Sequence, residues 1–321
     1  MTEVLHGLDP AGRERVAALR AEGRFFWLDV SFRETSSEDL VAALDPPEHA
    51  LQATGNGRLS RTLRADGASL GFALRCYVED AARSDGDEVA RLRPVRVHVV
   101  VTAEYLLTLH EERLSLPAAL GPNLPPERRG YAVYSVLDAI IASAFDALEE
   151  VELTLDPLAR TLTDGDGGLV PGATLQETGA RLAAMRRWVT AEQAVFGRLG
   201  VEVRALRGFD AGGDPSFDRL GEQVDRLLAS IDAAANGMGM LLDLQLNERA
   251  YLVSVVATIF VPLTFITGFF GMNFGWMVGR IESPAAFWFL GLLVPIATAA
   301  LGWRLVMRRF LTGDAPNARR R

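Results

Sequence analysis

Residues Tyr251–Phe274 read YLVSVVATIFVPLTFITGFFGMNF, and this stretch decides how the chain is organised. It lies within residues 250–279, which carry no charged side chain. About 20 consecutive apolar residues span a bilayer as a helix, so Tyr251–Phe270 predicts a transmembrane helix. Pro262 lies in its middle, where membrane helices tolerate proline if neighbouring groups satisfy the freed carbonyl.

A second apolar stretch, Ser283–Trp303, predicts a second transmembrane helix. The loop between the two spans holds one arginine, Arg280, whereas six arginines follow the second span. Because positive charge stays on the cytoplasmic side, both termini are predicted to be cytoplasmic and the loop external. Residues 1–20 lack the apolar core of a signal peptide, so the N-terminal part is also predicted to stay in the cytoplasm. We therefore expect a multi-pass protein of the inner or plasma membrane.

The charge of the chain is uneven. Residues 251–321 hold seven of the 33 basic residues but only two of the 41 acids, which leaves residues 1–250 with a net charge of −13. Every basic residue is arginine. Nucleic-acid binding requires a basic face, so an acidic body argues against a nucleic-acid partner.

Enzymatic function finds little support in the sequence. A single cysteine, Cys76, excludes a disulfide framework and a multi-cysteine metal cage. The four histidines show no metal-binding spacing, and a chain without lysine has no nucleotide-binding P-loop. No nucleophile–base pair is recognisable among residues 1–165. We expect a protein that is not an enzyme and that needs no cofactor.

The N-terminal region reads as mixed α/β. Strand-like runs lie at 24–30, 59–64, 69–78, 95–102 and 106–109, and helices are expected at 11–22 and 37–44. From residue 130 the pattern changes to long helices at 131–162, at 175–206 and from 216 onward. The predicted class is α+β, with a cytoplasmic domain at 1–165, a helical stalk at 166–250, two transmembrane helices at 251–311 and a basic tail at 312–321.

The third long helix carries apolar residues in a coiled-coil spacing: Leu220, Val224, Leu227, Ile231, Ala234, Met238 and Leu241. Nothing stops this helix before Phe270, which predicts a rod of about 80 Å at 1.5 Å per residue. A long stalk is the favoured interpretation. A buried helix in a bundle is the alternative, since Gly237 and Gly239 weaken the run.

One narrow face of the first transmembrane helix is small and weakly polar. Its residues recur three and four apart: Asn247, Ala250, Ser254, Ala257, Val261, Thr264, Gly268 and Gly271. Small residues let membrane helices approach closely, so the spacing alone favours helix packing over pore lining. A symmetric oligomer satisfies both interpretations, because several copies can surround one axis.

The run from Ala257 to Phe274 closely resembles the signature of the CorA family of divalent cation transporters. The resemblance implies a homopentamer with a cytoplasmic α/β/α domain shaped as a funnel, whose first membrane helices line a pore. By position along the signature, it implies an outer selectivity ring formed by Gly271, Met272 and Asn273. It also implies an inner polar ring at Thr264, a cytoplasmic pore end near Asn247, and hydrophobic constrictions at Val253 and Val261. With the first membrane helix lining the pore, the resemblance also makes Ala257 and Ser254 pore-lining residues.

The transported ion follows from ligand chemistry and from details of the match. Mg²⁺ releases its water reluctantly, and neutral amides and hydroxyls can bind those waters without removing them. Met272-Asn273-Phe274 is similar to the magnesium branch. A resemblance to the zinc-transporting ZntB branch rests on Arg249, Tyr251 and Ser254, and on a loop whose only acidic residue is Glu282. We favour Mg²⁺. Transport of Zn²⁺, Co²⁺ or Ni²⁺, with or without coupling to protons, is the alternative.

Members of the family often sense cytoplasmic metal at acidic sites between subunits. The resemblance offers Asp210, Asp214 and Asp218, with Asp225 and Asp232, as contributors from one subunit, and Asp85 and Asp87 from the next. A solvated carboxylate on a helix face is the commoner role for each. A membrane-anchored scaffold or sensor that moves no ion is the third functional hypothesis.

Overall fold

The structure, a computed structural model, describes residues 2–48, 50, 63–80, 92–112, 116–120, 129–163, 172–209, 216–272, 275, 279 and 283–311. The chain divides into two compact units, Met1–Met240 and Leu241–Arg321. The domain limits predicted after residues 165, 250 and 311 stay predictions.

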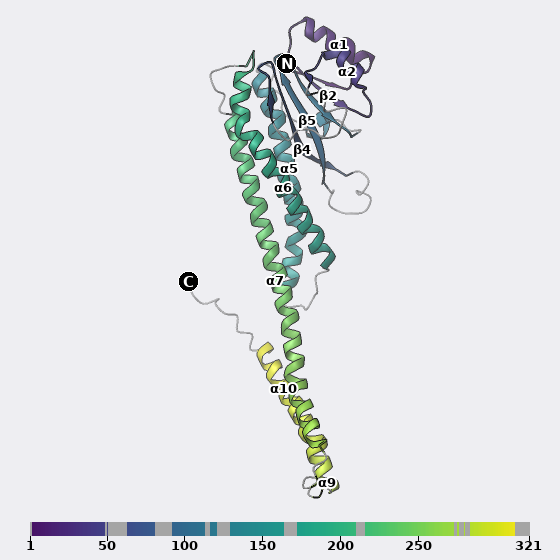
Figure 1. Ribbon diagram of the computed structural model, residues 1–321, viewed down its shortest axis with the longest axis vertical. Coiled ribbons are helices and arrows are strands. Elements are labelled where there is room, and N and C mark those ends of the chain that lie inside the picture. Colours follow the sequence, from purple (N-terminus) through teal and green to yellow (C-terminus); the bar gives the residue numbers. More distant parts are fainter. Residues whose placement is uncertain are drawn as a thin grey trace. The chain divides into compact units, whose positions relative to one another are not determined.

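The first unit combines a six-stranded sheet with helices (Figure 1). Strand order is β1-β2-β6-β5-β4-β3. The β1, β2 and β6 strands are parallel, and the remaining neighbours are antiparallel. The elements in chain order are β1 (Glu3–His6), α1 (Pro10–Ala21), β2 (Phe26–Ser31), α2 (Ser37–Leu44), β3 (Arg64–Ala65), β4 (Ser69–Glu79), β5 (Leu92–Thr102), β6 (Tyr105–His110), α4 (Leu116–Leu120), α5 (Arg129–Thr163), α6 (Gly172–Ala205) and α7 (Ser216–Phe270).

Each of the two short helices has a capped N-terminus. The Asp9 carboxylate accepts a hydrogen bond from the backbone N–H of Gly12 at 2.7 Å, and Pro10 occupies the first turn. The Ser36 hydroxyl accepts from the N–H of Asp39 at 3.1 Å, which starts α2 at the predicted Ser37. Both helices therefore confirm the sequence-based expectation to within a residue.

The sheet has two different buried faces. On the first, α1 and α2 pack over alternate residues of β2 and β6, including Phe26, Leu28, Leu107 and Leu109. The α5 helix packs on β4 and β5, and the start of α4 contacts Asp29 on the opposite face of β2, where Trp27 is fully buried. The sheet thus lies between two helical layers, as the predicted α/β/α domain requires (Figure 1).

The outer edge of β4 is closed by side chains of two helices. β3 pairs with β4 at Gly71 and Leu70, and no other described strand pairs with this edge of β4. The backbone N–H of Arg75 donates to Glu192 of α6 at 2.9 Å, and that of Tyr77 donates to Ser143 of α5 at 3.0 Å. These bonds satisfy an edge that would otherwise be open to pairing with another chain.

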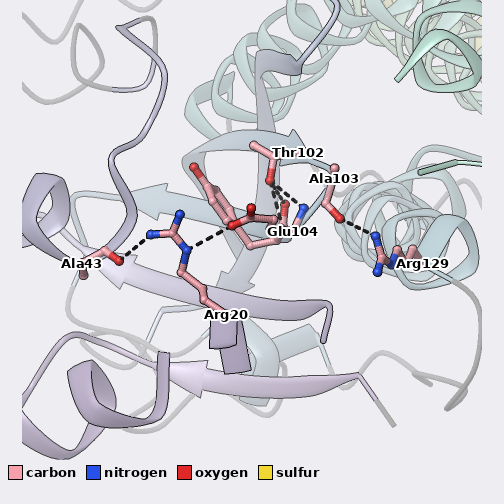
Figure 2. A network of polar contacts seen from close by, with 7 residues as sticks. Arg20, Ala43, Thr102, Ala103, Glu104 and Arg129 are labelled. Carbon is pink, nitrogen blue, oxygen red and sulfur yellow. Dashed lines mark hydrogen bonds and ion pairs between the residues drawn. The ribbon is translucent and has the colours of Figure 1, made fainter. Parts of the chain in front are cut away.

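The turn between β5 and β6 is tied to three other elements (Figure 2). Arg20 of α1 donates to Glu104 in this turn at 3.0 Å and to the carbonyl of Ala43 in α2 at 3.2 Å. Arg129, the first residue of α5, donates to the Ala103 carbonyl at 2.7 Å. Two arginines therefore connect the β5–β6 turn to the helices on both sides of the sheet.

A buried polar cluster lies between the sheet and α4. The Asp29 carboxylate accepts hydrogen bonds from the Thr108 hydroxyl at 2.6 Å and from the backbone N–H of Leu116 at 2.9 Å. His110 Nε2 lies 3.2 Å from the same carboxylate, and the Trp27 indole donates to the Thr108 hydroxyl at 3.0 Å. The cluster joins β2, β6 and the start of α4 inside the core.

The long helices begin and end close to the predicted residues, and α7 runs from Ser216 to Phe270 as expected. Within the first unit, its coiled-coil seam is buried against the same chain: Leu220, Val224, Leu227, Ile231 and Met238. Phe217 contacts Tyr134 of α5, and Met238 contacts Gly179 of α6. The helix is as long as the favoured interpretation, a stalk, predicts. Its seam, however, packs within the same chain, as the alternative interpretation of a helix in a bundle predicts.

The second unit contains the end of α7 and a second helical segment. This segment comprises α9 (Pro284–Ala286), a π-helical stretch η1 (Phe287–Leu293) and α10 (Val294–Leu311). It covers the predicted second span, Ser283–Trp303, and continues past it. The π-helical stretch was not predicted.

Candidate functional site

The second half of α7 has the composition of a membrane helix. By length and composition, two described helices are apolar enough to cross a bilayer, Ser216–Phe269 and Arg129–Arg160. The most apolar window of Ser216–Phe269 has a mean hydropathy of 2.2 and is not buried in the chain. The corresponding window in α5 is 56% buried, as expected for a core helix of the first unit. Trp288–Arg304 is a shorter apolar helix.

Within the second unit, one side of α7 is covered and the other is open. A side-chain carbon built at Gly302 of α10 would lie 3.5 Å from Ile259. The partly buried residues of α7 gather on this side: Val255, Ile259, Pro262, Leu263 and Ile266. The small-residue stripe lies opposite at 100° per residue, and all of its members are exposed: Asn247, Ala250, Ser254, Ala257, Val261, Thr264, Gly268 and Gly271.

In the part of the chain that the structure describes, packing therefore does not use the small-residue stripe. The two predicted constriction residues, Val253 and Val261, are 70% and 67% exposed. Such exposure of apolar residues on a helix without charges is typical of a surface that faces lipid or further copies of the chain.

Two threonine hydroxyls of this part of α7 donate to carbonyls of their own helix. The Thr258 hydroxyl donates to the Ser254 carbonyl at 2.8 Å, and the Thr267 hydroxyl donates to the Leu263 carbonyl at 2.9 Å. These threonines satisfy their own helix, as is common for hydroxyls in apolar surroundings. The α7 helix continues through Pro262 to Phe270.

The predicted selectivity residues follow the end of α7. The backbone N–H of Gly271 donates to the Thr267 carbonyl at 2.9 Å, and that of Met272 donates to the Phe269 carbonyl at 3.3 Å. Gly271 and Met272 are exposed. Asn273, the third predicted residue of the ring, lies outside the described residues.

The acidic residues considered for metal sensing have partners on α6 where they are described. Asp218 accepts from Arg204 at 2.9 Å, Asp225 from Gln193 at 2.7 Å, and Asp232 pairs with Arg186. Asp210, Asp214, Asp85 and Asp87 lie outside the described residues. In the described part of the chain, no three His, Cys, Asp or Glu side chains are grouped to hold a metal ion. A site shared between subunits stays a prediction.

A family model described as "CorA-like Mg2+ transporter protein" matches residues 22–309, which include both units. The chain belongs to the CorA-like Mg²⁺ transporter family. It is accordingly a transporter-family protein for divalent cations, and the resemblance of the Ala257–Phe274 run to this family is confirmed.

Among curated relatives, similarity extends to proteins named "Zinc transport protein ZntB". The protein of Enterobacter sp. is 26% identical over 263 residues, covering 79% of this chain and 78% of the relative. That of Klebsiella pneumoniae subsp. pneumoniae is 25% identical over 301 residues, covering 89% and 88%. These relatives carry the name of the zinc branch, whose ion is the alternative to Mg²⁺ in the sequence-based prediction.

Solved structures confirm the fold. The CorA magnesium transporter from Methanocaldococcus jannaschii has a TM-score of 0.58 at 17% identity and covers 88% of this chain and 90% of its own. Full-length CmaX has the same TM-score at 19% identity, with 88% and 87% covered. The ZntB cytoplasmic domain from Vibrio parahaemolyticus has a TM-score of 0.54 at 11% identity and covers 70% and 88%. At these identities the likeness concerns the fold alone.

Sequence reasoning missed a second cluster, in the first unit. Arg75 of β4 lies over the ring of Trp188 of α6, with its guanidinium carbon 4.0 Å from the ring centroid. Glu192, one helical turn after Trp188, binds the β4 edge. No local motif joins residues so far apart in the chain, so only the folded structure brings them together.

Proposed function

We propose that several copies of this chain assemble around an axis and form a gated pathway for hydrated divalent cations, lined by the small-residue stripe of α7. The observation that carries the proposal is the position of the stripe, which lies opposite the face covered by α10 and is exposed in one chain. A homopentamer, as the family resemblance implies, places five such stripes toward one axis.

The chemistry of the stripe suits an ion that keeps its water. Its polar members, Asn247, Ser254 and Thr264, offer neutral oxygen and amide groups, and Asn273 adds a further amide at the outer end. Such groups hydrogen bond to coordinated water and bind it weakly enough to release the ion. A membrane potential of 100 mV supplies about 2.3 kcal/mol per charge, so roughly twice that drives a divalent cation inward.

Mg²⁺ is the ion that we assign to this pathway. Residues 241–321 contain no histidine and no cysteine, the ligands that Zn²⁺ prefers when it sheds water. A pathway with oxygen and amide groups alone therefore favours a hard cation that is passed with its hydration shell.

Zn²⁺ is the second candidate, and a specific observation favours it. The curated relatives described above are named as zinc transport proteins. The external loop, which contains Arg280 and Glu282, also offers little negative charge to gather cations. Transport of Zn²⁺, with or without a proton gradient, is thus the alternative within the same pathway.

The proposed topology places the first unit and the C-terminal tail in the cytoplasm of a cell whose inner or plasma membrane holds α10 and the part of α7 that belongs to the second unit. Arg308 and Arg309, near the end of α10, and the arginines of the C-terminal tail support this orientation, and the loop at Arg280 then faces outward.

Flux into proteoliposomes tests the proposal. Full-length protein is reconstituted, and Mg²⁺ and Zn²⁺ entry are measured with ion-sensitive dyes, singly and in competition, with and without a pH gradient. We expect Mg²⁺ entry that Asn273→Ala lowers at least tenfold. The matched control is Asn236→Ala, an exposed asparagine in the first-unit part of α7, which should leave entry unchanged.

Each outcome is informative. Zn²⁺ entry that Mg²⁺ does not inhibit would identify Zn²⁺ as the transported ion, as in the zinc branch. Unchanged flux in Asn273→Ala would remove the outer ring from the mechanism. Flux no greater than that of empty vesicles would favour a scaffold or sensor.

A further inference from the structure

The small-residue stripe of α7 is preceded by an acidic residue in the same line. Members of the stripe are spaced alternately three and four residues apart, and the next position before Asn247 in this alternation is Asp243. At about 100° per residue, Asp243 lies about 160° around α7 from Ile259, which lies against Gly302 of α10. Asp243 belongs to the second unit and is exposed. It is therefore on the open side of α7, in line with the stripe.

Asp243 differs from the other aspartates of α7 in its contacts. Asp218, Asp225 and Asp232 each bind an arginine or a glutamine of α6. Asp243, in contrast, makes no hydrogen bond or ion pair within the described part of the chain. Its carboxylate is thus left to water or to a cation from outside the chain.

The position of this charge is unusual within the second unit. Residues 241–321 contain four acids, Asp243, Glu248, Glu282 and Asp314, and of these Asp243 alone continues the alternation of the stripe. Every member of the stripe from Asn247 to Gly271 is neutral. A single carboxylate therefore stands at one end of a neutral series of small and weakly polar residues.

The proposed topology places this carboxylate on the cytoplasmic side of the bilayer, eight residues before Tyr251. Cytoplasmic leaflets contain anionic lipids, which attract basic residues and repel carboxylates. The arginines near the end of α10, Arg308 and Arg309, suit such a surface. Asp243 does not, so a position that faces the axis of an assembly is more favourable for it than one that faces lipid headgroups.

We propose that Asp243 of each copy contributes to a ring of carboxylates at the cytoplasmic mouth of the ion pathway, which attracts hydrated divalent cations and holds them through their water. This inference rests on the assembly proposed above. Rings of Asp or Glu side chains are a common device of cation channels, and a mouth lined by one sign of charge concentrates its counter-ions. A carboxylate attracts a divalent cation twice as strongly as a monovalent one at the same distance.

The chemistry of such a ring suits the ion assigned to the pathway. Mg²⁺ bound through one or two carboxylates usually keeps several of its waters, so it can leave again. The outer loop, with Arg280 and Glu282, offers little net charge. The ring at Asp243 therefore supplies the negative charge of the pathway at its cytoplasmic end, where the neutral groups of the stripe provide none.

Replacing the charge at one cysteine tests the proposal. Full-length Asp243→Cys, in which Cys76 is buried, is labelled in detergent with a thiosulfonate that adds either a negative sulfonate or a positive trimethylammonium group. After reconstitution, Mg²⁺ entry is measured at concentrations where it is proportional to Mg²⁺. We expect the cysteine variant to lose about tenfold in rate, the sulfonate to restore most of it and the trimethylammonium group to lower it further. Glu14→Cys, at an exposed position of α1, should respond to neither reagent.

Two further variants make the same comparison without added bulk. Asp243→Glu should keep Mg²⁺ entry, and Asp243→Asn should lose it as the cysteine variant does. Light scattering in detergent establishes that each variant assembles like the unchanged protein. Equal effects of the two reagents, or unchanged entry in Asp243→Asn, would overturn the ring but leave the pathway, and Asp243 would then be a solvated carboxylate. No entry in the unchanged protein would overturn the pathway, and the ring with it.

Discussion

Gly302 of α10 lies against Ile259 of α7, so that a Cβ built at Gly302 would be 3.5 Å from Ile259 Cγ1. This distance is an ordinary van der Waals contact and leaves room for a methyl group but not for a longer side chain. The contact determines which side of α7 is covered within one chain. Ser254, Ala257 and Thr264 lie on the opposite side and are exposed.

Enlarging Gly302 should separate the two helices. We expect Gly302→Leu to lower the thermal unfolding temperature in detergent and to reduce ion flux, since overpacking typically costs about 1–3 kcal/mol. Gly302→Ala serves as the control and should behave like the unchanged protein in both measurements. Equal stability of the leucine and alanine variants would show that this contact does not hold α10 on α7.

Removing the Thr264 hydroxyl should weaken the inner polar ring. Thr264→Val keeps the shape of the side chain but cannot hydrogen bond to a hydrated cation, and we expect flux to fall about tenfold, equivalent to ~1.4 kcal/mol. The control is Thr298→Val on α10, whose hydroxyl donates to the Val294 carbonyl of its own helix at 2.8 Å. Comparable losses in both variants would argue against a specific role for Thr264.

Breaking the buried polar cluster should destabilise the first unit. Asp29→Ala leaves the Thr108 hydroxyl and the Leu116 N–H without their acceptor, and we expect the free energy of unfolding to fall by about 3 kcal/mol. Denaturant titration of the full chain measures the change. Asp39→Ala, at an exposed ion pair with Arg13, should have a much smaller effect.

Glu192 should make stability depend on pH. Burial raises its pKa from 4.5 to about 7 in the folded chain. Between these values the folded state holds a proton that the unfolded state has released, so the free energy of unfolding falls as pH rises. Glu192→Gln should reduce this slope between pH 4.5 and 7. Glu202→Gln on the same helix should keep it, and an unchanged slope in Glu192→Gln would contradict the assignment.

Local patterns in the sequence predicted most of the helices. Ser36 marked the start of α2, and the sequence showed no helix-stopping residue in α7 before Phe270. The β1 strand was missed, because Glu3–His6 is short and gains its stability by pairing with β2. The π-helical stretch Phe287–Leu293 was missed too, since a segment that is apolar on every side has no periodicity to interpret.

The candidate site, too, was predicted from the sequence only in part. The small-residue stripe was found from its spacing, but its position opposite Ile259 depends on the packing of α10, which spacing does not reveal. The stacking of Arg75 on Trp188 and the contact of His110 with Asp29 join distant parts of the chain. Such contacts arise from sheet register and helix docking, so a single sequence cannot predict them.

Labelling of single cysteines tests the central claim most directly. Cys76 is buried, which raises the pKa of its thiol to about 12, so it should stay unreactive in the starting protein. Thr264→Cys and Ile259→Cys are each reconstituted, treated with a charged, water-soluble thiosulfonate reagent and assayed for flux. A pathway lined by the stripe predicts that the reagent blocks Thr264→Cys and leaves Ile259→Cys unaffected. Block of Ile259→Cys alone would contradict the account.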